Sequence, residues 1–150
     1  MQSISTDLTI TAARSEDLQQ VFALLEECGL PREGLENHLS TTLVARKGIE
    51  IIGSAALELY QEHTLLRSVA VKSAFRKQGI GLKLAKAALD LAKERQVRNV
   101  YLLTETAKAF FSKQGFNQVL RSDVPETVKQ SVEFTTLCPD TCTVMMKKLV

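Results

Sequence analysis

The residues best suited to chemistry gather where a β-branched run meets a basic turn and then a helical pattern. Arg76, Lys77 and Gln78 precede two glycines, Gly79 and Gly81. The first amides of a helix have no intrahelical partner, and the helix dipole adds partial positive charge at that end. Glycine lets an oxyanion approach the backbone because no Cβ stands in the way. The segment predicts an anion site; an ordinary strand-to-helix turn with glycines chosen for their dihedral angles is the alternative.

Ionisable residues inside apolar runs are the next candidates. Glu58 falls in the apolar run 55–60, where an idle carboxylate is out of place unless it points to solvent. Arg67 is suited to bidentate binding of a carboxylate, with a cross-strand ion pair as the alternative. Ser68 either orients substrate or water or is structural. Glu105 is a second candidate carboxylate, although the dipole of the helix that it precedes explains it equally well.

Histidines and cysteines predict no metal site. His63 lies in a polar hairpin and His38 on a weak helix, and both are expected at the solvated surface. Cys28 belongs to an apolar stripe and is expected in the core. Cys138 and Cys142 would suit a soft metal or trivalent arsenic. Two thiolates make a poor site and their spacing is not a zinc signature, so buried or edge thiols are predicted.

The periodicity of the chain predicts the strands and helices that must position these residues. Strands are expected at 8–13, 41–46, 50–60, 64–71, 99–103, 116–120 and 142–149. Helices are expected at 15–28, with Ser15 as N-cap, after Gly79, and at 107–114, with a weak one at 35–39. The strands within 41–71 are expected to form an antiparallel meander. The order of these elements predicts an α/β (α+β) fold with a mixed sheet.

Bulk properties narrow the class of protein. A chain of 150 residues without a Pro/Gly/Ser-rich linker predicts one domain over 1–150. A net charge of +2 counts against a dedicated nucleic-acid binder. No stretch approaches the roughly 20 apolar residues that span a bilayer, and the first residues do not read as a secretory signal. With an odd number of cysteines, three, and no export signal, the expected location is the cytoplasm. The expected oligomeric state is a monomer or homodimer.

Two longer motifs resemble the GNAT superfamily of N-acetyltransferases. The run from Arg76 to Gly81 matches the pattern Arg/Gln-x-x-Gly-x-Gly/Ala that this family places after a hydrophobic strand. The run from Ala107 to Phe116 resembles the family's later helix, which ends in an aromatic residue and then Gly-Phe. One helix and one strand separate the two motifs, as in the family, and together they cover about half of the chain. Neither a P-loop nor a dinucleotide Gly-x-Gly-x-x-Gly motif is present.

The resemblance implies the GNAT fold, a splayed sheet of six or seven strands flanked by helices, with the strand at 64–71 beside that at 99–103. It implies acetyl-CoA as co-substrate and a small amine as acceptor. Backbone groups of Val69, Ala70 and Val71 are then expected to hold the pantetheine arm, and the amides of Arg76, Lys77, Gln78, Gly79, Ile80 and Gly81 to cradle the pyrophosphate. The resemblance also assigns Thr104, Ala107, Phe110 and Phe111 to the cofactor site.

The chain departs from the family pattern at two positions. Phe111 stands where many members have a Tyr that protonates the departing thiolate, and Thr104 where many have Asn. Phenylalanine donates no proton, so either another group serves as the acid or the thiolate leaves unassisted. Unassisted departure is tolerable because a thiol has a pKa of about 8.5.

A finer resemblance concerns the acceptor. The segment 102–107 followed by Phe110 and Phe111 is similar to the acetyltransferase domain of N-acetylglutamate synthases. The segments 57–58, 65–68 and 125–139 resemble acetyltransferases of bacterial arsenic-resistance operons. Both imply an amino-acid-like acceptor. Glu58 is then the candidate base, Glu105 the second, and Arg67 the ligand of the acceptor's carboxylate. A non-catalytic acyl-CoA or amino-acid binding module, or a protein N-acetyltransferase, is the alternative.

Overall fold

The computed structural model describes residues 7–137 and 141–149 as strands joined by helices and short turns. The strands are β1 (Leu8–Ala12), β2 (Thr42–Lys47), β3 (Glu50–Tyr60), β4 (His63–Val71), β5 (Asn99–Thr104), β6 (Asn117–Val119) and β7 (Thr143–Lys148). The α-helices are α1 (Leu18–Glu27), α2 (Ile80–Glu94), α3 (Lys108–Ser112) and α4 (Glu126–Lys129). Short 3-10 turns lie at Ser15–Asp17, Leu35–Thr41, Ser73–Phe75 and Arg121–Asp123, and a π-helical turn at Glu133–Leu137.

The strands form one mixed sheet in the order β1-β2-β3-β4-β5-β7-β6. β1, β2 and β3 pair antiparallel, β7 pairs antiparallel with both β5 and β6, and β4 pairs parallel with β5. The predicted mixed sheet, its seven strands and the neighbourhood of β4 and β5 are confirmed. The β4–β5 register runs over three pairs, from His63 with Asn99 to Leu65 with Tyr101, although β4 continues to Val71.

The described residues group into two compact units. The first contains 7–56 and Ser68–Asp90, and the second contains Leu57–Arg67 and the described residues from Leu91 onward. The chain passes from one unit to the other within β3, β4 and α2. The expectation of a single domain over 1–150 stays a prediction.

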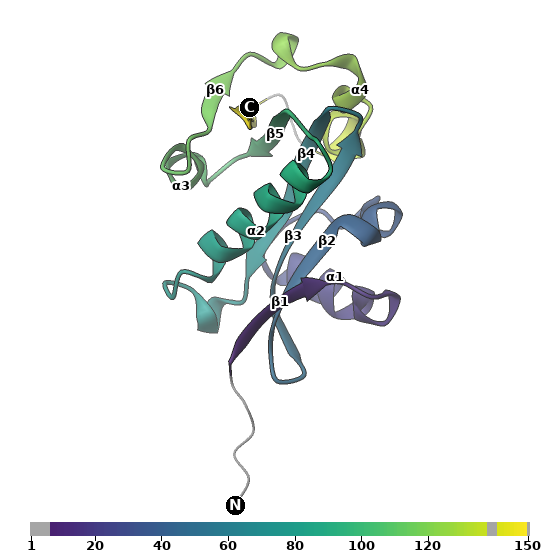
Figure 1. Ribbon diagram of the computed structural model, residues 1–150. Coiled ribbons are helices and arrows are strands. Elements are labelled where there is room, and N and C mark those ends of the chain that lie inside the picture. Colours follow the sequence, from purple (N-terminus) through teal and green to yellow (C-terminus); the bar gives the residue numbers. More distant parts are fainter. Residues whose placement is uncertain (1–6, 138–140, 150) are drawn as a thin grey trace, which may run out of the picture. The chain divides into compact units, whose positions relative to one another are not determined.

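The core of the first unit forms where α1 packs on the strands. Val21, Leu24 and Leu25 of α1 are buried in one cluster with Val44 and Ile51. In Figure 1, α1 lies behind β1 and β2, whereas α2 lies in front of β3. Burial of this stripe supplies the hydrophobic stabilisation that the helical spacing predicts.

The predicted N-cap at Ser15 is wrong. The chain first makes a 3-10 turn over Ser15–Asp17, and α1 begins only at Leu18. The buried Asp17 carboxylate accepts a hydrogen bond from the Arg14 amide at 2.8 Å and pairs with Arg46 of β2. With these two partners, the Asp17 carboxylate stabilises the turn before α1 in place of the expected Ser15 hydroxyl.

The core of the second unit joins β4, β5 and β7 to the segment that follows β6. Leu65, Tyr101 and Val144 form a buried cluster with Val124 and Val128. Val128 lies in α4, an element that the sequence does not predict, since its four residues are too few to show a period. Burial of the two valines fixes the segment 121–129 against the strands.

Gly53 in β3 has no room for a side chain. A Cβ at this position would lie 2.7 Å from Leu84 Cδ1 of α2 and 3.0 Å from the Ala70 carbonyl oxygen. The glycine therefore sets how closely α2 approaches β3.

We expect Gly53→Ala to lower the free energy of unfolding by about 1–3 kcal/mol, the usual cost of overpacking. Without a clash, the same change in a strand would stabilise by about 0.5–1 kcal/mol, so the sign itself is informative. Urea denaturation measures the effect. In a Leu84→Ala background the Gly53→Ala penalty should shrink clearly, and an unchanged penalty there would show that Leu84 is not its cause.

Candidate functional site

The turn before α2 belongs to the first unit and contains two residues with left-handed backbone. Lys77 has φ 66° and Gly79 has φ 80°. The Lys83 amide donates to the Gly79 carbonyl at 3.1 Å, so this carbonyl accepts an early bond of the 15-residue helix. The amides before Lys83 at the start of α2 then have no partner within the helix. A lysine with positive φ is uncommon, and such outliers are concentrated at binding sites.

The turn leaves space where the sequence predicts an anion. A Cβ added to Gly79 would meet no protein atom within 4 Å, so packing does not explain this glycine. The positive φ at position 79 explains part of the need for glycine. The open space beside Gly79 also fits a phosphate group held by backbone amides. Lys77 and Gln78 are exposed on the same turn.

Arg76 is tied back toward the end of β4. Its Nε donates to the Val71 carbonyl at 3.0 Å, and its Nη2 donates to Cys28 Sγ at 3.4 Å. The Cys28 thiol in turn lies 3.6 Å from the same carbonyl, as its donor. The expected core position of Cys28 is confirmed only in part, since the residue is half-buried and packs beside the core cluster.

The β4 segment predicted to hold pantetheine begins at a backbone distortion. Ser68 has φ 59° although it lies within the strand, and its carbonyl accepts a hydrogen bond from Ser54 Oγ at 2.7 Å. Left-handed residues inside strands mark bulges, which are frequent beside functional sites. The contact of Val69, Ala70 and Val71 with a cofactor stays a prediction.

The second unit contains a buried cluster of charges. Arg67 Nη1 lies 2.8 Å from Glu58 Oε2, and Arg67 Nη2 lies 3.5 Å from Glu133 Oε2. The Tyr60 hydroxyl donates to Glu58 Oε1 at 2.5 Å. The side chains of Arg67, Glu58 and Glu133 are only 0%, 2% and 8% exposed. Two carboxylates thus flank one guanidinium away from water.

The environment keeps Glu58 ionised and Tyr60 neutral. Burial alone raises the pKa of Glu58, but hydrogen bonds from Tyr60, Arg67 and Ser131 outweigh it and hold the pKa below its ordinary value. Burial, and then the hydrogen bond to the Glu58 anion, raise the pKa of Tyr60 far above its ordinary value. A carboxylate with a lowered pKa is a weak proton acceptor.

This cluster bears on the predicted roles of Arg67, Glu58 and Ser68. The cross-strand ion pair left open for Arg67 is present, and its guanidinium already contacts two carboxylates. The alternative in which Glu58 points to solvent is excluded by its burial. Ser68 is buried as well. Direct contact of Arg67 or Ser68 with an acceptor stays a prediction that this geometry does not favour.

The end of β5 carries the second candidate carboxylate. Glu105 is exposed in the loop between β5 and α3. Before it, the buried Thr104 accepts a hydrogen bond at Oγ1 from the Ala107 amide at 2.9 Å. Phe111 is buried edge-to-face against Phe110 and Phe116, with ring centroids 5.0 and 5.6 Å away. Thr104 therefore positions the start of α3, and Phe111 occupies an apolar position.

Neither predicted surface histidine is fully solvated. His38 is half-buried, and the His63 side chain is 20% exposed, with Nδ1 3.2 Å from Asn99 Nδ2. Both residues are therefore only partly solvated, so the prediction of a solvated surface position holds in part. Cys142 is buried, whereas Cys138 lies outside the described residues. Within 7–137 and 141–149 no three His, Cys, Asp or Glu side chains are grouped as a metal site would require.

A profile of the Acetyltransferase (GNAT) family matches residues 6–116, well over half of the chain. The chain belongs to the GNAT acetyltransferase family. An amino-acid acetyltransferase of Neisseria meningitidis serogroup A is 28% identical over 129 residues, which cover 80% of this chain and 30% of that protein. An amino-acid acetyltransferase of Vibrio cholerae is 31% identical over 119 residues, which cover 73% of this chain and 27% of that protein. The GNAT chain spans about three-tenths of the length of these curated relatives.

Solved structures of GNAT-like proteins share the fold. The N-acetylglutamate synthase of Neisseria gonorrhoeae, complexed with coenzyme A and N-acetyl-glutamate, aligns with a TM-score of 0.82 at 24% identity, covering 96% of this chain and 35% of that one. A Mycobacterium tuberculosis protein in complex with CoA aligns with a TM-score of 0.78 at 22% identity, covering 95% and 99%. The predicted GNAT fold is confirmed. Among the described residues no helix is long and apolar enough to cross a bilayer.

The buried cluster predicts a specific acid dependence of stability. Because the folded-state pKa of Glu58 lies below its ordinary value of 4.5, its contribution is present above about pH 4.5 and is lost as the pH falls through the folded pKa. The free energy of unfolding of native protein should therefore fall toward that of Glu58→Gln as the pH drops below about 4.5, by up to about 1.4 kcal/mol per pH unit. Denaturant titrations at each pH measure the difference.

Asp17 provides the internal reference for this experiment. The hydrogen bond from Arg46 lowers its pKa from 3.8, so it also destabilises the fold on acidification. Its effect is common to native protein and Glu58→Gln and cancels in the difference. A difference that is constant from pH 7 to 3 would contradict the ionised, stabilised state of Glu58.

Proposed function

We propose that the chain is an acetyl-CoA-dependent N-acetyltransferase for the amine of a small, amino-acid-like acceptor. The observation that carries the proposal is the open turn at 76–79, where two left-handed residues lead into the first amides of α2, which have no partner within the helix. Membership of the GNAT family and the CoA bound to the N. gonorrhoeae and M. tuberculosis structures support this cofactor.

The cofactor would contact backbone more than side chains. The amides from Arg76 to Gly81 would bind the pyrophosphate, and the β4 backbone at 69–71 the pantetheine arm. Thr104, Ala107, Phe110 and Phe111 would complete its surroundings. When bound, acetyl-CoA supplies an activated acetyl group whose thioester carbon is open to attack by a neutral amine.

The amine must lose a proton before it attacks, and the two candidate carboxylates differ in their fitness for this task. Glu58 is buried, hydrogen-bonded by three side chains and held at a lowered pKa. Glu105 is exposed at the end of β5. We assign the base to Glu105, acting directly or through one water, and a positioning role to Glu58.

A second candidate function is a binding module that keeps the CoA turn without catalysis. Phe111 favours it, since this side chain donates no proton and is packed between two other rings. In the enzyme, the thiolate would have to leave without an acid at this position, which the acidity of thiols allows near neutral pH.

Release of free thiol from acetyl-CoA separates the two functions. The acceptor panel contains acidic, neutral and basic amino acids and simple amines. It also contains an arsenic-containing amino acid, because the sequence resembles arsenic-resistance acetyltransferases. Turnover with a small amine, confirmed by mass spectrometry of the acetylated product, supports the enzyme. If calorimetry shows CoA binding and no acceptor is turned over, the result would instead support the function of a binding module.

We expect Gly79→Ala to weaken CoA binding at least tenfold, because a methyl group and a strained backbone would occupy the turn that receives the pyrophosphate. Gly48→Ala is a matched control, since Gly48 also has positive φ, 61°, and a Cβ added there would likewise have no atom within 4 Å. Both variants should lose roughly 1 kcal/mol of stability from the backbone strain. Equal CoA affinities of the two variants in calorimetry would show that the pyrophosphate does not bind at this turn.

We expect Glu105→Gln to lower kcat roughly a hundredfold or more, the usual contribution of a general base, with the KM for acetyl-CoA unchanged. Glu62→Gln, which alters an exposed carboxylate of the β3–β4 turn, is the control and should react at the native rate. A native rate for Glu105→Gln, together with a hundredfold loss in folded Glu58→Gln, would transfer the role of base to Glu58.

A further inference from the structure

The Arg76 side chain connects three segments of the first unit that meet at the turn before α2. Its Nε donates to the Val71 carbonyl oxygen at 3.0 Å, and its Nη2 donates to Cys28 Sγ at 3.4 Å. The Cys28 thiol donates to the same Val71 carbonyl at 3.6 Å, so the three groups form a closed network. Cys28 is the C-cap of α1, Val71 is the last residue of β4, and Arg76 follows the 3-10 turn after that strand.

The geometry of the network depends on a guanidinium. Two nitrogens of its rigid plane donate at once, so the group is fixed at two points. The Val71 carbonyl oxygen has two lone pairs and accepts two bonds, one from Arg76 and one from the thiol. A lysine ammonium carries the same charge on a flexible stem and lacks this planar fork.

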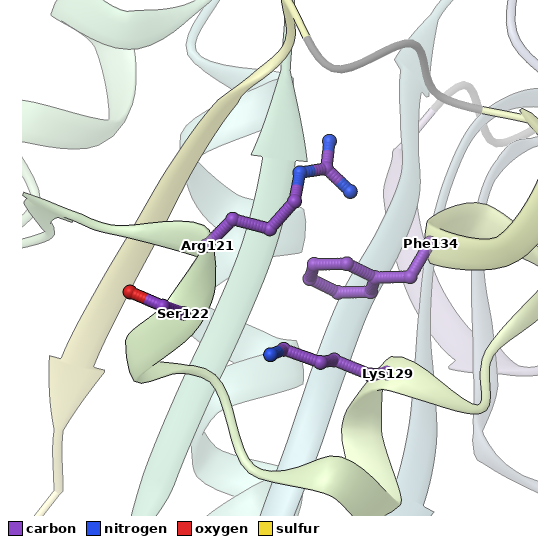
Figure 2. A pocket seen from close by; sticks show the side chains of 4 residues that line it. All are labelled: Arg121, Ser122, Lys129 and Phe134. Atoms are coloured by element: carbon purple, nitrogen blue, oxygen red, sulfur yellow. The ribbon is translucent and has the colours of Figure 1, made fainter.

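Arginines of the second unit have partners of other kinds. Arg67 lies between two carboxylates. Arg121 lines a pocket that Figure 2 shows, with its guanidinium carbon 5.3 Å from the centroid of the Phe134 ring. The partners of Arg76 are a backbone carbonyl and a thiol that itself donates a hydrogen bond. Its bonds therefore connect segments of the chain and do not neutralise a carboxylate.

The turn at 76–79 needs support from outside its own backbone. Lys77 is left-handed at φ 66°, which is costly for a residue with a side chain. The Arg76 amide reaches the Ser73 carbonyl only at 3.4 Å, which is long for a hydrogen bond. Backbone strain persists where the surrounding structure determines the conformation. The Arg76 side chain supplies such a constraint at the first residue of the turn.

The end of α1 favours the Arg76 cation in this position. α1 is a helix of 10 residues that ends at Glu27, with Cys28 as its C-cap. The carbonyl groups of a last helical turn carry partial negative charge, which stabilises a cation placed beside them. The contact with Cys28 places the guanidinium at this helix end.

We infer that Arg76 is a positioning residue for the cofactor. Through the Val71 carbonyl and the Cys28 thiol, its side chain holds the end of β4 and the turn in the conformation that receives the pyrophosphate. The inference rests on the proposed function, since it requires CoA to bind at this turn. A direct contact between the guanidinium and a phosphate is the competing role. The two roles differ in the effect of lysine at position 76, which keeps the charge and loses the planar fork.

Calorimetric titration of CoA into the full chain tests this role without requiring catalysis. We expect Arg76→Gln and Arg76→Lys to weaken CoA binding to a similar extent, roughly tenfold, as loss of hydrogen bonds from a charged donor does. Cys28→Ala should weaken it roughly threefold, and Cys28→Ser, which keeps a donor and an acceptor, should restore most of that loss. Lys86→Gln removes a positive charge from an exposed position of α2 and should bind CoA normally.

Two further measurements separate placement from charge. In a Cys28→Ala background, Arg76→Gln should cost less affinity than in native protein, because the two residues share one network. The ratio of native to Arg76→Gln affinity should persist from roughly 50 to 500 mM salt, since added salt screens an exposed charge but does not replace a lost hydrogen bond. Arg76 is exposed, so its variants should fold, which circular dichroism checks.

The outcomes separate this inference from the proposed function. Similar losses in both Arg76 variants, coupled to Cys28 and persistent at high salt, support the positioning role. Native affinity in either Arg76 variant, or a loss that disappears at high salt, overturns it, even if acetyl transfer to amines is observed. CoA binding that depends on the network, with no thiol release on any acceptor, supports the positioning role and contradicts the proposed enzyme. With turnover, a raised KM for acetyl-CoA in Arg76→Lys at unchanged acceptor KM supports a role confined to the cofactor. Absence of CoA binding by native protein would overturn both.

Discussion

Burial of Arg67 between two carboxylates is the constraint on which the second unit depends. A guanidinium with no exposed area has lost its hydration, and only well-placed anions compensate for that loss. Glu58 comes from the neighbouring strand, and Glu133 from the turn after α4. The interaction therefore ties β3 and β4 to a segment far along the chain. Because Phe134 follows Glu133 directly, the same ion pair also helps to hold the Phe134 ring against the core cluster of the second unit.

In the first unit, the turn at 76–79 that we propose for the cofactor is formed by backbone conformation. Lys77 and Gly79 both lie in the left-handed region. Conformational strain of this kind costs on the order of 1 kcal/mol at each non-glycine residue, and the surrounding packing must compensate for it. A site made from amides also tolerates changes of those side chains around it that do not hold its backbone, whereas the cluster at Arg67 tolerates few.

Local pattern was enough to predict the strands and α2, because alternation and helical spacing express local preferences. Contacts between residues far apart in the sequence could not be predicted from local pattern. No local signal indicates that Arg67 pairs with Glu133, or that the His63 ring contacts Asn99, 36 residues away. The left-handed Ser68 was missed because its neighbours read as a regular β-branched strand. α4 was missed because it and the 3-10 turn before it are too short to show a helical period.

The position of β7 has a consequence for the order in which the molecule is made. β7 is the last described strand of the chain, yet it lies between β5 and β6, pairing over six residues with one and three with the other. During synthesis, which adds roughly 5–20 residues per second, β5 and β6 leave the ribosome before their shared neighbour exists. The first unit, whose sequence ends at Asp90, has no such dependence. A nascent chain can thus complete one half of its sheet while the other half waits for its central strand, with two unpaired edges exposed in the interval.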